Sequence, residues 1–167
     1  MTLANRVTLA EIPSGDAGTV ATLKAMRSYA RQGSKDIRVR ELAMSLVSDV
    51  PGRKNWRGQV RALHSFVQNS IQYVRDIVNV ETLQTPAMTL QYGAGDCDDQ
   101  ATLLAALLQS IGHPARFVAI ALRPRGPFAH VYTETKIDDR WYPLESTENW
   151  PAGQGPPLYF RRLVLKV

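Results

Sequence analysis

One segment of the chain, residues 95–112, constrains the fold more than any other. Its apolar side chains recur at helical spacing, at Leu103, Leu104, Leu107, Leu108 and Ile111. Because this stripe is wide, the helix is expected to lie in the centre of the molecule. Asp96 is a favoured N-cap, and Asp98 and Asp99 complement the helix dipole in the first turn. Gly112 is a typical stop after the last turn.

The segments before this helix have helical spacing, whereas those after it alternate like strands. We expect three earlier helices, over residues 16–32, 35–50 and 55–71, the last capped by Asn55. Residues 72–92 show no regular pattern, and their expected packing anchors are Tyr73, Pro86 and Tyr92. Strands are expected over residues 115–122, 128–137, 140–145 and 158–167. Helices followed by an antiparallel sheet predict an α+β fold.

The composition narrows the classes of protein that the chain can belong to. Its 167 residues suit one domain over 1–167, with a helical part at about 1–75. No apolar run is long enough to span a membrane, and the N-terminal residues lack the apolar core of a signal peptide. We therefore expect a cytoplasmic protein. Cys97 is the only cysteine, which excludes an internal disulfide and a four-cysteine zinc site.

Cys97 falls in the first turn of the central helix, where a thiol has chemical consequences. The exposed N–H groups and the helix dipole at this position favour a thiolate. The same N–H groups could hold an oxyanion during acyl transfer. We therefore interpret Cys97 as a nucleophile, against the alternative of a packed core thiol. The nearby carboxylates oppose ionisation, but we expect capping and outward-facing side chains to weaken their effect.

His130 and Glu145 are the partners that the spacing suggests for Cys97. His130 begins a strand that can pack against the start of the cysteine helix and can act as base. A tight turn at Asp138–Asp139 pairs residues whose numbers sum to about 277, so residue 132 would face Glu145. His130 is then a diagonal neighbour of Glu145 on the same face. The carboxylate can orient the imidazole.

Other chemistry-bearing residues have simpler interpretations. His64 lies among apolar residues of the third helix and His113 follows a helix end, so we interpret both as structural. The acidic cluster is preferred as a helix cap. A metal site is the alternative, since oxygen ligands would come from Asp96, Asp98 and Asp99. Two further hypotheses concern the rim of the site: an oxyanion donor or wall from Gln91 and Tyr92, and a substrate-admitting loop with Arg123 and Arg125.

Three motifs in this order resemble those of the transglutaminase-like superfamily, in its bacterial and phage forms. The first is Tyr92-Gly93-Ala94-Gly95-Asp96-Cys97-Asp98-Asp99, followed by Ala101, Leu104, Leu107, Leu108, Gly112, Pro114, Ala115 and Arg116. The second is Ala129-His130-Val131-Tyr132, and the third is Trp141-Tyr142-Pro143-Leu144-Glu145-Ser146-Thr147. The resemblance covers residues 58–147.

This resemblance implies a papain-like α+β core over about 58–167, with the cysteine helix packed on an antiparallel sheet. Members of the superfamily include transglutaminases, proteases and amide hydrolases, and all of them work through a thioester. The chain departs from the pattern at Glu145, where an aspartate is usual. It also has Asp98 where animal transglutaminases have tryptophan after the cysteine, which argues against a specific role in protein crosslinking.

Two functions remain open from the sequence. In the first, Cys97 attacks a peptide or carboxamide carbonyl, His130 acts as base and then acid, and Glu145 orients it. Hydrolysis is favoured over crosslinking because nothing marks an amine site, and no metal or organic cofactor is needed. In the second, the chain is a structural or adaptor protein, such as a phage-encoded virion component, that keeps the fold without turnover.

The basic residues before Cys97 do not decide between these functions. Residues 24–61 hold ten basic and three acidic side chains. Their helical spacing without interleaved aromatic residues favours a solvated helix face over a nucleic-acid surface. A protein or peptide substrate is the expected partner of the enzyme. In the adaptor, the same stretch would dock a virion protein; neither function requires nucleic acid or a membrane.

Overall fold

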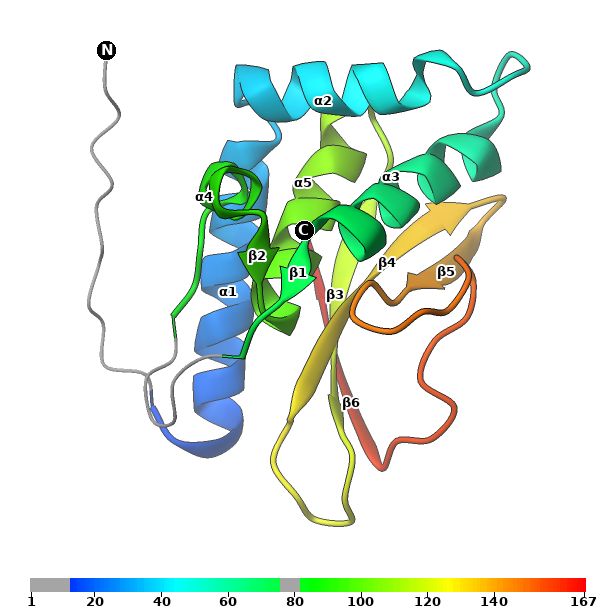
Figure 1. Ribbon diagram of the computed structural model, residues 1–167. Helices are drawn as coiled ribbons and strands as arrows, with labels where there is room; N and C mark the ends of the chain where they lie inside the picture. Colours follow the sequence, from blue (N-terminus) through cyan, green and yellow to red (C-terminus); the bar gives the residue numbers. More distant parts are fainter. Residues whose placement is uncertain (1–12, 76–81) are drawn as a thin grey trace.

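Helix α5 (Cys97–Ser110) lies at the centre of the molecule, as its apolar stripe predicts (Figure 1). The computed structural model describes residues 13–75 and 82–167. Ten consecutive residues of α5, from Asp99 to Leu108, are buried. The helix contacts the other four helices of the described chain and two strands of the sheet. These helices are α1 (Gly15–Gly33), α2 (Ile37–Ser48), α3 (Trp56–Ser70) and α4 (Pro86–Tyr92).

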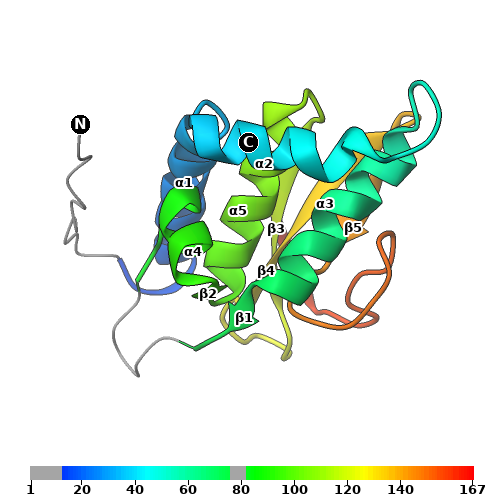
Figure 2. The same cartoon turned by 45° about the horizontal axis from the view of Figure 1, so that its top comes forward.

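The three helices before α5 that the pattern predicts are confirmed, and each of the last two begins at a side-chain cap. Asp36 accepts a hydrogen bond from the backbone N–H of Arg38 at the start of α2. Asn55 accepts one from Gly58 at the start of α3, in the predicted capping role. Together with α1 and α4, these helices cover α5 on the side away from the sheet (Figure 2).

The described residues of the segment expected to be irregular contain one short helix and one short strand. Helix α4 has only seven residues, begins after Thr85 and carries Pro86 in its first turn, so it is too short for an apolar period to appear. Strand β1 (Gln72–Tyr73) pairs in parallel with β2 (Ala94–Gly95). Pro86 is buried, but Tyr73 and Tyr92 are 44% and 55% exposed. The prediction that both tyrosines anchor the packing is therefore wrong.

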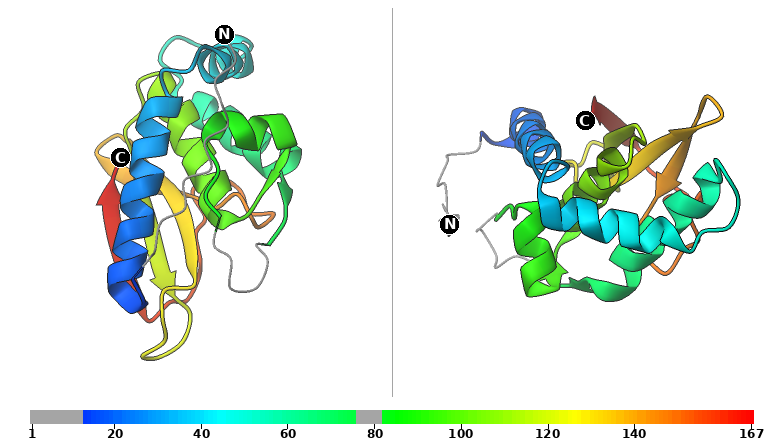
Figure 3. Two further views of the ribbon diagram at one scale, coloured as in Figure 1. Left: turned by 90° about the vertical axis from the view of Figure 1, so that its left-hand side faces the viewer. Right: turned by 90° about the horizontal axis from the view of Figure 1, so that it is seen from above.

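Four antiparallel strands form the sheet, in the order β5-β4-β3-β6. They are β3 (Ala115–Ala121), β4 (His130–Ile137), β5 (Arg140–Leu144) and β6 (Arg161–Lys166). The helices gather on one face of this sheet, as the two views of Figure 3 show. The predicted α+β fold is confirmed, although β4 begins two residues and β6 three residues later than expected.

The β4–β5 hairpin has the register that the tight turn predicts. Asp138 and Asp139 both adopt positive φ, 50° and 62°, as a two-residue hairpin turn requires. Thr133 pairs with Leu144 and Ile137 with Arg140, so paired numbers sum to 277. Glu145 therefore follows the last pair of the ladder directly, on the same side of the molecule as the start of β4.

Among the described residues, no helix combines the length and the apolar character needed to cross a membrane. The expectation about a leader segment concerns residues 1–12, which lie outside the described residues.

The leucines of α5 are fully buried, so we expect them to contribute to the stability of the core. Leu107 is fully buried in the core, so we expect Leu107→Ala to lower the free energy of unfolding by about 2–5 kcal/mol. Met44→Ala is the matched control, because the Met44 side chain on α2 is 61% exposed, and it should change stability by less than about 0.5 kcal/mol. Urea unfolding followed by circular dichroism measures both; equal losses would contradict a core centred on α5.

Candidate active site

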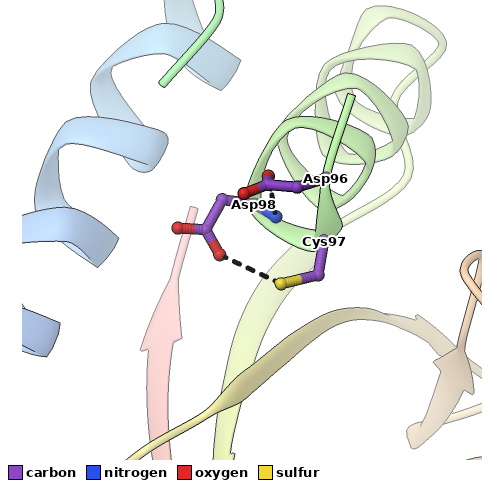
Figure 4. A group of neighbouring side chains, drawn as sticks. All are labelled: Asp96, Cys97 and Asp98. Carbon is purple, nitrogen blue, oxygen red and sulfur yellow. Dashed lines mark hydrogen bonds between the residues drawn. The ribbon is translucent and has the colours of Figure 1, made fainter. Parts of the chain in front are cut away.

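Cys97 is the first residue of α5, and its thiol is partly buried beside β4. The backbone of Val131, the residue after His130, hydrogen-bonds to the sulfur. The thiol also contacts Asp98, with 3.5 Å between Sγ and Oδ1, and the two side chains point toward each other at the tip of the helix (Figure 4). The structure therefore places Cys97 at the start of the central helix, as predicted, and next to the strand that carries His130.

The acidic residues around Cys97 form a capping box. The Asp96 carboxylate accepts from the backbone N–H of Asp98 at 3.0 Å and of Asp99 at 3.2 Å. In return, the Asp99 carboxylate accepts from the Asp96 N–H and, through its other oxygen, from Gln84 at 2.7 Å. Glycine is needed at position 95, because a Cβ there would lie 2.6 Å from that of Asp99. Asp96 and Asp99 thus have the helix-capping role that the sequence favoured.

The alternative of a metal site involves a different set of ligands from the one expected. Buried Asp99 is used by the cap, whereas ligand atoms of Asp96, Cys97 and Asp98 lie within 4.8 Å of one another. The Asp96 carboxylate is engaged by the helix cap, and Asp98 contacts the Cys97 thiol, so each of the two has a partner within the protein.

The electrostatic expectation for Cys97 is wrong. Burial raises the pKa of the Cys97 thiol strongly, and the carboxylates of Asp98 and Asp96 raise it further. The Val131 backbone hydrogen bond acts in the opposite direction but does not compensate. Two full negative charges outweigh the partial positive charge of a helix N-terminus. At neutral pH the Cys97 side chain is therefore a neutral thiol and not a thiolate.

The expected oxyanion donors are also largely occupied. The backbone N–H groups of Asp98 and Asp99 donate to the Asp96 side chain, and that of Gln100 donates to the Asp96 carbonyl. In the described part of the chain, the first-turn N–H group that could still donate to a substrate oxyanion is that of Cys97 itself. Helix capping and oxyanion binding compete for the same donors, which the sequence pattern alone does not reveal.

His130 and Glu145 are in direct contact. His130 Nε2 lies 2.5 Å from Glu145 Oε2, and the carboxylate is almost fully buried, at 1% exposure. The other oxygen, Oε1, accepts from the backbone N–H of Thr147 at 2.9 Å and from its hydroxyl at 2.7 Å. Burial acts to raise the pKa of Glu145, but the hydrogen bonds from His130 and Thr147 hold it below its ordinary value. Glu145 is thus a fixed, ionised acceptor for the imidazole.

The bond to Glu145 also defines the tautomer of His130. A carboxylate can only accept, so Nε2 carries a proton and Nδ1 is the nitrogen with a free lone pair in the neutral ring. This is the state that a general base needs.

Cys97 and His130 line a common cleft of about 350 Å³. Its walls come from the first half of α1, from the start of α5 and from the segment before and at the start of β4. Neither Gln91 nor Arg123 or Arg125 lines it, so the hypotheses for these residues gain no support. Asp96 and Asp98 do line it, which makes the cleft acidic beside the thiol.

Two residues near the site were not predicted to have a role there. Tyr73 pairs with Gly95, two residues before Cys97; desolvation raises the pKa of its hydroxyl, and Cys97 and Asp96 add to the effect. His64 donates from Nε2 to the backbone carbonyl of Glu145 at 2.7 Å. Both contacts join segments distant in sequence, so no local pattern records them.

The family of the chain follows from its match to a protein-family model. The family model described as the transglutaminase-like superfamily matches residues 43–146, more than half of the chain and all three site residues. The chain belongs to this superfamily. The resemblance carried by the three sequence motifs is thereby confirmed at the level of the family.

Solved structures of several bacterial proteins share the fold. A candidate protease from Parabacteroides distasonis is 15% identical, with a TM-score of 0.61, and the match covers 78% of this chain and 26% of that one. A candidate cysteine protease from Cytophaga hutchinsonii is 19% identical, with a TM-score of 0.54, over 78% and 50% of the two chains. Calcium-bound LapG from Legionella pneumophila is 20% identical, with a TM-score of 0.54, over 77% and 75%.

The chain thus spans about a quarter and a half, respectively, of the first two structures. A search among curated proteins finds no match.

The raised pKa of Cys97 predicts a stability that falls in alkali. Above the ordinary thiol pKa the unfolded chain loses its thiol proton, but the folded protein keeps it, so rising pH favours unfolding. This contribution is about 1.4 kcal/mol per pH unit at most. Urea unfolding at pH 8 and pH 10 should show a larger loss for the native chain than for Cys97→Ala. An equal loss in both would contradict a thiol held neutral by its surroundings.

The carboxylate of Asp98 should slow alkylation of Cys97. In Asp98→Asn the negative charge beside the sulfur is removed, the thiol pKa falls, and iodoacetamide at pH 7.5 should label Cys97 roughly tenfold faster. Asp49→Asn, at the exposed end of α2, is the control and should label at the native rate. Mass spectrometry of the intact protein gives both rates; an unchanged rate in Asp98→Asn would argue against the electrostatic cause.

Proposed function

We propose that this protein is a cysteine-dependent enzyme that cleaves or transfers an acyl group from a peptide or carboxamide through a thioester. The observation that carries this proposal is the short contact between His130 and the buried Glu145, beside a cleft that His130 shares with Cys97. A histidine that only fills space needs no ionised carboxylate at 2.5 Å. Membership of the transglutaminase-like superfamily supports the same chemistry.

The reaction begins from the neutral thiol. As the Cys97 sulfur attacks the substrate carbonyl carbon, its proton passes to the free nitrogen of His130, and the sulfur–carbon bond forms. Glu145 stabilises the imidazolium through the Nε2 proton. The oxyanion that develops is stabilised by the N–H of Cys97. His130 then protonates the leaving nitrogen, the carbon–nitrogen bond breaks, and a thioester remains.

Resolution of the thioester completes the cycle. Water or an amine donates its proton to His130 and attacks the acyl carbon, and the thiol leaves with the proton that His130 returns. His130 is neutral again once it has protonated the leaving nitrogen, so it can serve as the base for this step as well. We favour hydrolysis over amine transfer, because Asp98 follows the cysteine where animal transglutaminases have tryptophan.

Casein tests the proposal, because it offers peptide bonds and glutamine carboxamides together. New amino termini report proteolysis, released ammonia reports deamidation, and incorporation of a fluorescent primary amine reports transfer. Hydroxylamine provides a further trap, since it converts an acyl-thioester into a hydroxamate. The assay is run with added calcium and with EGTA, because LapG from Legionella pneumophila is known in a calcium-bound and an EGTA-treated form.

Three substitutions should lower whichever of these activities is found, for different reasons. Cys97→Ala should abolish it, because no nucleophile remains. His130→Ala should reduce kcat by about 10²–10⁴-fold, the usual contribution of a general base. Glu145→Gln keeps the side-chain shape but removes the charge that stabilises the imidazolium, so it should reduce kcat with little change in KM.

Two controls complete the test. Glu148→Gln, in the exposed segment after β5, should retain native rates. Labelling of Cys97 by iodoacetamide provides a measure that needs no substrate, and it should slow in His130→Ala and Glu145→Gln. Absence of all three activities, together with labelling rates that neither substitution changes, would reject the enzyme and favour the structural or adaptor protein.

A further inference from the structure

We infer that His64 is a positioning residue that holds the backbone of Glu145 so that its carboxylate reaches His130, an inference that rests on the proposed function. The Nε2 of His64, on α3, lies 2.7 Å from the carbonyl oxygen of Glu145. Both residues are almost fully buried. The two are 81 positions apart, so the contact joins the helical part of the molecule to the far end of the β4–β5 hairpin.

The direction of this hydrogen bond is determined by its chemistry. A carbonyl oxygen only accepts, so the proton must lie on Nε2 of His64. Burial lowers the pKa of His64, and therefore the ring is neutral and presents this one tautomer. A neutral donor adds no charge beside the His130–Glu145 pair, and it satisfies a carbonyl that would otherwise be buried without a partner just beyond the ladder.

The segment that carries Glu145 needs such a support. Strand β5 ends at Leu144, and the residues that follow have no regular secondary structure. Helix α3 supplies backbone contacts over this stretch, since Gln68, one turn after His64, donates to the carbonyls of Glu148 and Trp150. His64 and Gln68 are four residues apart and lie on the same face of the helix. One helix face thus fixes the path of the whole segment.

Glu145 is held at both ends as a result. Thr147 fixes one carboxylate oxygen, and His64 fixes the carbonyl at the other end of the residue. A glutamate side chain has one more rotatable bond than an aspartate, so its carboxylate is placed less tightly by the backbone alone. With only 2.5 Å between Glu145 and His130, small displacements of the backbone break the contact.

A matched pair of amide substitutions tests this role. In His64→Gln the side-chain nitrogen is as many bonds from the backbone as Nε2 of histidine, so the donor to Glu145 is kept. In His64→Asn the nitrogen is one bond closer and cannot reach. We expect His64→Asn and His64→Phe to reduce kcat, and the rate of Cys97 alkylation, by about ten- to hundredfold with KM little changed. His64→Gln should stay within about threefold of the native rates.

His113 provides the control for a merely structural effect. It is also a buried histidine, but its Nε2 lies 3.0 Å from Gln59, away from Glu145. His113→Asn should lower the unfolding temperature in the same way as His64→Asn but leave both rates at the native level. Rates are compared only among variants that circular dichroism shows to be folded. If His64→Phe does not fold, the positioning role is tested by comparing the rates of His64→Gln and His64→Asn.

The outcomes separate this inference from the proposed function. If His130→Ala and Glu145→Gln slow alkylation but His64→Asn labels at the native rate, the positioning role is rejected and the enzyme stands. Rates in His64→Gln as low as in His64→Asn also reject the positioning role. If neither His130→Ala nor Glu145→Gln slows alkylation and none of the three activities on casein is found, the proposed function itself fails, and the inference fails with it.

Discussion

The capping box at the start of α5 is the interaction on which the rest of the site depends. Asp96 and Asp99 bind each other's backbone N–H groups and so define the residue at which the helix begins. Successive helical residues are rotated by about 100°, so a start one position later would turn Cys97 away from β4. The second oxygen of Asp99 binds Gln84 and ties in the segment before α4. The cap therefore stabilises the central helix and also determines the direction in which the Cys97 side chain points.

The same cap makes the site electrostatically unfavourable for a thiolate. Carboxylates stabilise the start of a helix, but they repel a neighbouring thiolate. At Cys97 both effects occur within the first turn of the same helix. The conflict is resolved if the sulfur is charged only during the reaction, when His130 takes its proton. In the proposed reaction the imidazolium forms only as the thiol reacts, so the ionised Glu145 matters more there than it would beside a preformed ion pair.

The sequence predicts those features that rest on local patterns. The central helix, its cap, the three earlier helices and the hairpin register follow from periodicity and turn chemistry within one segment. Helix α4 is too short to show a period, and the position of β6 beside β3 depends on a pairing between strands about forty residues apart. The thiol pKa and the competition for first-turn N–H groups require side-chain positions. The contact of His64 with Glu145 arises only when α3 packs across the end of the hairpin.

The departure at position 145 and the buried His64 are connected by geometry. The ladder ends at the pair Thr133 and Leu144, so the side chain of Glu145, one residue further on, reaches His130 from just beyond the ladder. An aspartate would need the backbone to lie closer to the imidazole, whereas a glutamate needs it held further back. On the inference drawn for His64, its bond to the Glu145 carbonyl sets this depth, since the buried residues Val60, Leu63 and Val67 fix α3 in the core. The choice between aspartate and glutamate at position 145 would then follow from the place of α3 and from the reach of the side chain.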